Sequence, residues 1–353
     1  MELVINDRFR KRKVTFFNNF NINLKFDSVA SSFNFGFYFN PDNIDHKELL
    51  CIGHYHPCIL THNDELIITG TMLSNGFTAG TKREPVNVSG YSLPGVFEDC
   101  DIPLDISLET NRLSLRQIAQ RICDRFGIQM VVAPQVAADM DKLIAASIAS
   151  AGTSIKAYFA QLAAQKNITI THTPAGALLF TRANTSQQPA FQFKAGMPEV
   201  TMSLSFNGQA MHSHITAVKE PDSEGGNQGE ETVRNPYVIN NVYRPKVVTQ
   251  SSGDDIDTKQ VAMNALAQEL KNLSLSIQID RWSIKKDGII RPNTIITVIN
   301  PDIYLYKESR WFVEEVTMVG NEDSATATLK CVLPEAYNGN MPEYLFKGIN
   351  MHA

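Results

Sequence analysis

The sequence lacks any run of about 20 apolar residues, the length that a membrane-spanning helix needs, so we expect no membrane span. Residues 1–13 also lack the basic, apolar and small-residue order of a secretory signal peptide. Cysteine is scarce, with five in 353 residues, and an odd number at irregular spacing argues against a disulfide framework. These absences predict a chain that folds in a reducing cytoplasm.

Charge of either sign is modest, with 20% charged residues and a formal net charge of -5. A mildly acidic chain gives no general reason to expect binding to a polyanion. The one basic run, residues 8–13 (RFRKRK), is typical of a solvated edge or arm, and contact with nucleic acid is the alternative. The 43% of hydrophobic residues and the length indicate a globular protein of two or three domains.

Motifs of enzyme active sites occur only in broken form. Residues 90–95 (GYSLPG) resemble a nucleophile elbow, but the second glycine comes one residue late and Pro94 stands where the helix should begin. Residues 76–82 (GFTAGTK) have the wrong spacing for a phosphate-binding loop. Glu314 and Glu315 would point to opposite faces of a strand and cannot share a substrate. We predict no catalytic residue and a protein that is not an enzyme.

The densest group of metal-ligand types lies in residues 51–58 (CIGHYHPC), with His62 four residues later. On a strand, His54, His56 and Cys58 would share one face, and a His-x-His pair on a strand can hold a metal ion. The spacing matches no common zinc pattern, and a buried cysteine beside surface histidines is the preferred interpretation. We predict no metal and no cofactor, and His54, His56 and Cys58 are the residues that would bind a metal if one is present.

The N-terminal part, residues 14–90, alternates apolar and polar side chains as half-buried strands do. In residues 33–39 (FNFGFYF) four phenylalanines share one face. A polar corner at residues 62–64 predicts a hairpin, and VNVSG at 86–90 predicts a further strand. Several short strands with turn signals between them are typical of a small barrel or sandwich.

The next part predicts a compact α/β module. Ser114 and Gln117 match a capping box, apolar residues follow at helical spacing, and Gly127 suits a left-handed helix end. An alanine-rich piece at 136–150 is also predicted to be helical, and another helix should begin near residue 154. ITITH and ALLFT then form a predicted hairpin around a Pro-Ala-Gly turn.

The last part begins with a predicted loop or linker at residues 219–236, which are rich in Gly, Glu and Pro and have no apolar period. A helix is expected at about residues 257–273. Its apolar stripe comprises Met263, Leu266, Leu270 and Leu273. Residues 275–353 then predict a second all-β unit, so that two β units enclose an α/β insert.

Five stretches, in this order, resemble one known family. They are residues 86–102 (VNVSGYSLPGVFEDCDI), 113–128 (LSLRQIAQRICDRFGI), 154–183 (SIKAYF to LLFTRA), 242–248 (VYRPKVV) and 281–337 (RWSIKK to CVLPEAY). The family is that of the baseplate hub proteins of Mu-like bacteriophages. The resemblance spans most of the chain and is therefore more specific than any single motif.

The resemblance implies an α+β, mainly β protein with two tail-tube-like β-barrel domains and an inserted small α/β domain, assembling as a ring-shaped trimer. The implied N-terminal barrel comprises residues 1–90, and the α/β domain comprises residues 91–190. A connecting region with the helix at about 257–273 spans residues 191–274, and residues 275–353 form the C-terminal barrel. Barrels leave no free sheet edge, and a ring of strands makes a rigid conduit.

The function that the resemblance implies is that of a structural baseplate hub of a contractile phage or prophage tail. Such a hub joins the tail tube to the central spike and lines the DNA passage. Its partners would be further copies of itself in a homotrimer, the central spike protein, the tail tube and other baseplate proteins. DNA would pass through without specific binding. The protein would be assembled in the host bacterial cytoplasm and reside in the tail baseplate of the virion.

Three alternatives stay open. The same hub would serve a phage-derived injection apparatus, such as a tailocin or a secretion system. A metal-dependent hydrolase would use His54, His56 and Cys58. A carbohydrate- or peptidoglycan-binding module would use the small α/β unit at residues 113–182.

Overall fold

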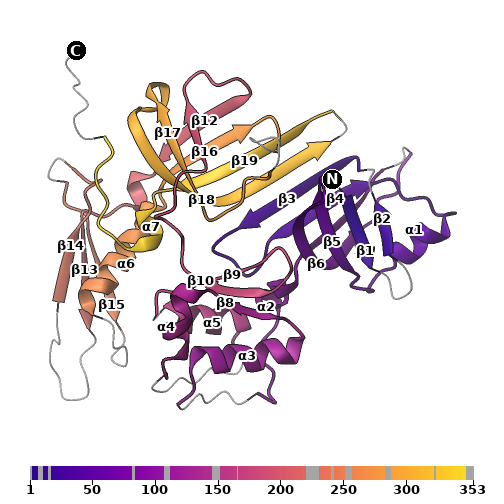
Figure 1. Cartoon of the computed structure of the whole chain (residues 1–353), viewed down its shortest axis with the longest axis horizontal. Coiled ribbons are helices and arrows are strands. Elements are labelled where there is room, and N and C mark those ends of the chain that lie inside the picture. Colours follow the sequence, from indigo (N-terminus) through magenta and orange to yellow (C-terminus); the bar gives the residue numbers. More distant parts are fainter. Residues whose placement is uncertain are drawn as a thin grey trace. The chain divides into compact units, whose positions relative to one another are not determined.

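The computed structural model describes residues 2–6, 11–14, 17–81, 84–106, 112–144, 152–164, 166–219, 230–239, 242–250, 257–282, 288–321 and 323–346 (Figure 1). The chain divides into two compact units. The first comprises Met1–Arg182, Asp280–Ile290 and Val316–Ala327, and the second comprises Ala183–Ile279, Arg291–Glu315 and Thr328–Ala353. Among the described residues, no helix has the length and apolar character to cross a membrane. All five cysteines are free thiols.

The first unit contains an antiparallel sheet with the strand order β3-β4-β7-β6-β5-β1-β2. A short helix, α1 (Ile44–Leu49), precedes β5. The strands are β1 (Glu2–Asn6), β2 (Lys11–Val14), β3 (Asn19–Lys25), β4 (Ser32–Phe37), β5 (Pro57–His62), β6 (Glu65–Gly76) and β7 (Val86–Ser92).

The predicted alternation in this region is confirmed. Phe33, Phe35 and Phe37 of β4 are buried on one face of the sheet, as expected for a period of two. The strand ends at Phe37, so the predicted element at 33–39 is two residues too long. The predicted hairpin is also present, because Asn63 and Asp64 join β5 to β6 with φ of 48° and 63°.

The α/β module of the first unit packs helices on a three-stranded sheet with the order β8-β10-β9. Ser114 caps α3 through the predicted capping box with Gln117, and Gly127 ends the helix with φ of 65°. The elements are η1 (Leu93–Gly95), α2 (Val96–Asp99), α3 (Leu115–Phe126), β8 (Met130–Val132), η2 (Pro134–Val136), α4 (Ala137–Asp141), α5 (Ile155–Ala164), β9 (Thr169–His172) and β10 (Leu178–Thr181). The expected helix at 136–150 is only the short α4, and residues 145–150 lie outside the described part.

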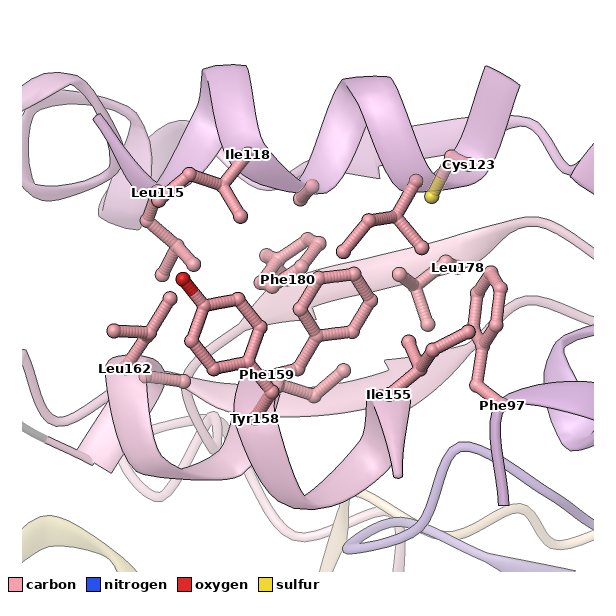
Figure 2. Close-up of a cluster of buried hydrophobic side chains, with 14 of the residues drawn as sticks. Phe97, Leu115, Ile118, Cys123, Ile155, Tyr158, Phe159, Leu162, Leu178 and Phe180 are labelled. Atoms are coloured by element: carbon pink, nitrogen blue, oxygen red, sulfur yellow. The ribbon is translucent and has the colours of Figure 1, made fainter. Parts of the chain in front are cut away.

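The core of this module lies between α3, α5 and β10, whose apolar side chains point into the same space (Figure 2). Phe159 is fully buried there and meets Phe97 and Phe180 edge to face, with ring centroids 5.8 and 6.0 Å apart. Each buried phenylalanine contributes about 2–3 kcal/mol by leaving water. The module is therefore a closed core of its own.

The second unit contains the strands in the order β12-β16-β19-β18, with β17 beside β18 and β11 beside β17. β18 and β19 contribute residues to both units. The elements are β11 (Phe191–Lys194), β12 (Val200–Phe206), η3 (Gly208–Ala210), β16 (Leu273–Ile279), β17 (Thr294–Asn300), η4 (Pro301–Ile303), β18 (Leu305–Asn321), β19 (Ala325–Val332) and α7 (Glu335–Asn338).

A smaller sheet of the second unit has the order β14-β13-β15 and packs against the helix α6. β13 is His214–Lys219, β14 is Glu230–Arg234, β15 is Pro245–Gln250 and α6 is Thr258–Leu270. β13 pairs antiparallel with β14 and parallel with β15.

Two predictions for this part are wrong. Residues 220–229 of the predicted linker at 219–236 lie outside the described part, but residues 230–234 form β14 and not a loop. Val233 alone is buried in β14, so the strand has no visible apolar period. The predicted helix to residue 273 ends at Leu270, and Leu273 begins β16. Leu273 matched the helical stripe because it is buried, as the apolar residues of α6 are. The coarse prediction of a mainly β protein with an α/β part is confirmed, although the described strands of one chain form no closed barrel.

Candidate functional site

The structure places the three residues that would bind a metal in different surroundings. His54 is exposed, with its ring 5.2 Å from that of His56, and both precede β5, which begins at Pro57. His56 is buried, and its Nε2 lies 3.3 Å from the carbonyl oxygen of Glu48. Cys58 lies inside the sheet, where burial raises the pKa of its thiol to about 12, so the thiol stays protonated at neutral pH.

The two further candidate ligands lie elsewhere. Cys51 is exposed ahead of β5, and His62 at the end of β5 lies edge to face against Trp282, with ring centroids 4.9 Å apart. Burial lowers the pKa of His62. Within the described ranges, no group of three or more His, Cys, Asp or Glu side chains is arranged to hold a metal ion.

The broken elbow motif has a structural role at Ser92. This residue ends β7 and is fully buried. Its Oγ accepts a hydrogen bond from the Ser31 backbone N–H at 3.1 Å and donates one to the Val29 carbonyl at 3.4 Å. A hydroxyl committed to the backbone in this way holds a loop against the sheet and presents no nucleophile.

Glu314 is a buried carboxylate of β18 with three partners. Its oxygens lie 3.0 Å from the Nζ atoms of Lys271 and Lys330, and the Tyr337 hydroxyl donates to it at 2.7 Å. Burial alone would raise the pKa of Glu314, but Lys271, Tyr337 and Lys330 together hold it below its usual value. The cluster joins the C-terminal end of α6 and α7 to the sheet, so its role is structural.

A second buried carboxylate, Glu269 of α6, was not predicted from the sequence. One of its oxygens lies 2.7 Å from His212 Nδ1 and 3.0 Å from Lys246 Nζ, and the other accepts the His212 backbone N–H at 2.8 Å. The sequence feature that could have indicated this buried carboxylate is a glutamate directly before Leu270, a residue of the apolar stripe of the predicted helix. This cluster fastens α6 to the small sheet.

The free edge of β12 is the first candidate assembly surface. β12 pairs with β16 in a regular seven-residue register and ends the order of the described strands, so no described strand pairs with its other edge. Its sequence, VTMSLSF, contains no charged residue and no proline, and Phe206 is 50% exposed. Natural proteins blunt open edges with lysine, proline or bulges, because an unprotected edge pairs with other chains. β12 is therefore suited to contact another chain.

The exposed side of β3, β4, β6 and β7 forms a second notable surface. It contains a shallow hollow of about 350 Å³. The hollow is lined by Asn21, Asn23, Ser32, Phe33, Asn34, Leu73, Ser74, Ser89 and Gly90. Six of these nine residues carry an amide or a hydroxyl group, and none of them is charged.

No protein-family model and no curated protein matches the sequence. Solved structures do match. A 43 kDa tail protein of prophage MuSo2 from Shewanella oneidensis is 18% identical over 97% of this chain and 100% of its own, with a TM-score of 0.79. The tail protein from Neisseria meningitidis MC58 is 16% identical over 96% of this chain and 98% of its own, with a TM-score of 0.77.

A more distant match is the E. coli c3393 protein, a component of the type VI secretion system that is described as similar to the bacteriophage T4 tail proteins gp27 and gp5. It is 8% identical, with 98% of this chain and 80% of its own covered and a TM-score of 0.57. At these identities the likeness establishes the fold. The chain has the fold of Mu-like prophage tail proteins, which is the family that its sequence resembles.

Proposed function

We propose that the protein is the baseplate hub of a contractile phage or prophage tail. In this proposal three copies form a ring that joins the tail tube to the central spike and surrounds the passage for DNA. The end-to-end match to two prophage tail proteins supports it, because both chains of each pair are covered almost completely. The likeness to a secretion component described as similar to T4 tail proteins gives further support.

The observation that carries the proposal is the open, uncharged edge of β12. An open edge of this kind can pair with strands of further chains. In a closed ring each such edge is covered by the neighbouring copy, so that no more chains add to it. β12 then contacts the neighbouring copy. Each chain contributes two tube-like barrels, one built around residues 1–90 and one around residues 275–353, and the sheets of adjacent copies complete them. Residues 91–190 are the inserted α/β domain.

The partners follow from the same placement. The ring contacts the central spike protein, the tail tube and other baseplate proteins, and DNA passes through it without specific binding. It is assembled in the host cytoplasm and resides in the tail baseplate of the virion. The protein catalyses no reaction in this role.

The test is the mass of the full-length protein in solution, alone and with the spike protein encoded in the same genome. Sedimentation velocity should show a species of three times the 39.3 kDa chain mass, alone or once the spike protein is added. A monomer that never joins the spike protein would contradict the proposal. Stoichiometric zinc in the purified protein would instead favour a hydrolase, and retention of the chain on cell-wall material would favour a wall-binding module.

A second candidate is the hub of a phage-derived injection apparatus, either a tailocin or a secretion system. The fold shared with the type VI secretion component favours it. Electron microscopy of particles that contain the protein distinguishes the two. Tails attached to filled capsids support the phage, and tails without capsids support the injection apparatus.

A further inference from the structure

The first polar face is the exposed side of β3, β4, β6 and β7 in the first unit. The strand registers align its side chains across the sheet in a row of Asn21, Asn34, Ser89 and Ser74. Asn23 and Ser32 form a neighbouring cross-strand pair. All of these residues line the hollow of about 350 Å³. The opposite side of the same strands carries buried phenylalanine and aliphatic residues, so the two sides of the sheet differ sharply.

The second polar face is the outward side of β12 and β16 in the second unit. Its cross-strand pairs are Thr201–Gln278, Ser203–Ser276 and Ser205–Ser274. The alternate residues of β16, Leu275 and Ile277 among them, are fully buried. The second unit thus repeats the chemistry of the first polar face with different residues and a different strand pairing.

Neither face contains a charged side chain within its rows, although 20% of the residues in the chain are charged. This is unusual, because exposed positions are where lysine, arginine, aspartate and glutamate concentrate. Charged residues stand instead where the strands end, at Lys25, Glu199 and Asp280. The same exclusion of charge in two separate units indicates a shared requirement.

Hydroxyl and amide side chains of this kind keep a surface hydrated without giving it a charge. Lysine and arginine would bind phosphates and release counterions, and carboxylates would repel them. Bases stack on exposed aromatic rings, and in these rows the aromatic ring is that of Tyr91, which pairs with Ser32 and is half-buried. The faces are equally unlike the aromatic and apolar centre of a protein interface. A surface that neither binds nor repels phosphate groups is suited to a polyanion that moves past it.

We infer that the two polar faces line the passage through the ring and are the surfaces that DNA moves past. The inference rests on the proposed function and deepens it, because it names the part of each unit that meets the DNA.

The test adds positive charge to both faces in the full-length protein. The variant Asn34→Lys/Gln278→Lys would give a trimeric ring about six extra positive charges. The control is Gln120→Lys at an exposed position of α3, which adds about three, the same number as Gln278→Lys alone. Binding is measured with a linear DNA duplex and with a covalently closed circle of the same sequence. A linear duplex can thread into a preformed ring, whereas a closed circle cannot.

The double variant should bind linear duplex and not the closed circle, and its affinity should fall on the order of 10³-fold between 50 mM and 200 mM salt. The control should not discriminate between the two DNA forms. The inference would be overturned if the double variant bound both DNA forms equally, or if it bound DNA no better than the wild type. A measured trimer mass would still support the proposed function in that case. A neutral polysaccharide that binds the wild type and is lost in Asn34→Lys would also overturn it. If Asn34→Lys fails to fold, Gln278→Lys alone retains the test.

Discussion

The two strands β2 and β12, which end the order of the described strands, differ in whether charged residues protect their outer edges. β2 has the sequence KRKV, and such a density of positive charge discourages a further strand from pairing. β12 has the sequence VTMSLSF and carries no charge. In the proposed ring, the edge that is left unprotected is the one that another copy covers. Of the basic run at residues 8–13, residues 8–10 lie outside the described part, and Lys13 on β2 is exposed.

Loss of the α/β core should have the largest effect and should leave both edges unchanged. Phe159→Ala removes a fully buried ring between α3, α5 and β10, and such substitutions cost about 3–5 kcal/mol. Chemical denaturation should show this loss, and sedimentation should show the same oligomeric mass as the wild type at low denaturant. A loss of oligomer without a loss of stability would mean that the α/β module, and not β12, mediates association.

A substitution that lowers the stability of the second unit, which contains β12, extends the comparison of β2 with β12. Glu314→Gln leaves Lys271 and Lys330 beside an uncharged amide and should lower the free energy of unfolding by about 2–3 kcal/mol at pH 7. The folded pKa of Glu314 lies below its ordinary value of 4.5, so its contribution is present above that value. The contribution disappears as the pH falls from about 4.5 through the lower folded pKa.

The measurement is denaturant unfolding of wild type and variant at pH 7 and at a series of lower values. The difference between them should shrink as the pH falls, because the wild-type carboxylate becomes protonated. The matched control is Glu315→Gln, the adjacent residue on the opposite face of β18. A difference that stays constant down to the lowest pH would contradict the assigned ion pairs.

Charge placed on β12 should make it resemble β2. Leu204→Lys/Phe206→Lys puts two lysines on an edge that we propose to be covered, and should raise the dissociation constant of the ring by more than about 100-fold. Sedimentation velocity at low micromolar concentration should then show a monomer. Gln120→Lys on α3 is the control and should assemble as the wild type does. An unchanged trimer would show that β12 lies outside the subunit contact.

The converse change on β2 should have the smallest effect. Lys13 is exposed on that strand, and Lys13→Val should make its edge less protected. Static light scattering should show a modest rise in self-association, about twofold, at high protein concentration. A fall in self-association would show that positive charge on β2 attracts copies of the chain instead of keeping them apart.

Helix ends and turns that depend on neighbouring residues could be predicted from local sequence patterns. The capping box at Ser114 and Gln117 and the polar corner before β6 each fix a turn or an end through neighbouring residues, and both were found from the sequence. β14 was missed because Val233 is its one buried residue, and a strand with a single buried side chain has no apolar period.

Features that depend on distant pairing could not be predicted in the same way. Residues 280–290 and 316–327 belong to the first unit although they lie far along the chain, and no local pattern records this. Alternation identifies a strand, but only the pairing shows that β12 ends the order of the described strands. The role of the buried Glu269 likewise depends on its contacts with His212 and Lys246, which lie outside α6.

The central claim is that a second copy covers the edge of β12, and hydrogen exchange tests it most directly. Exchange of the backbone amides of β12 is compared between the wild-type assembly and the Leu204→Lys/Phe206→Lys variant. The account predicts that the amides of β12 exchange about 100-fold more slowly in the assembly, whereas those of β2 exchange at the same rate in both. Equal exchange of β12 in a trimer and in a monomer would contradict the account.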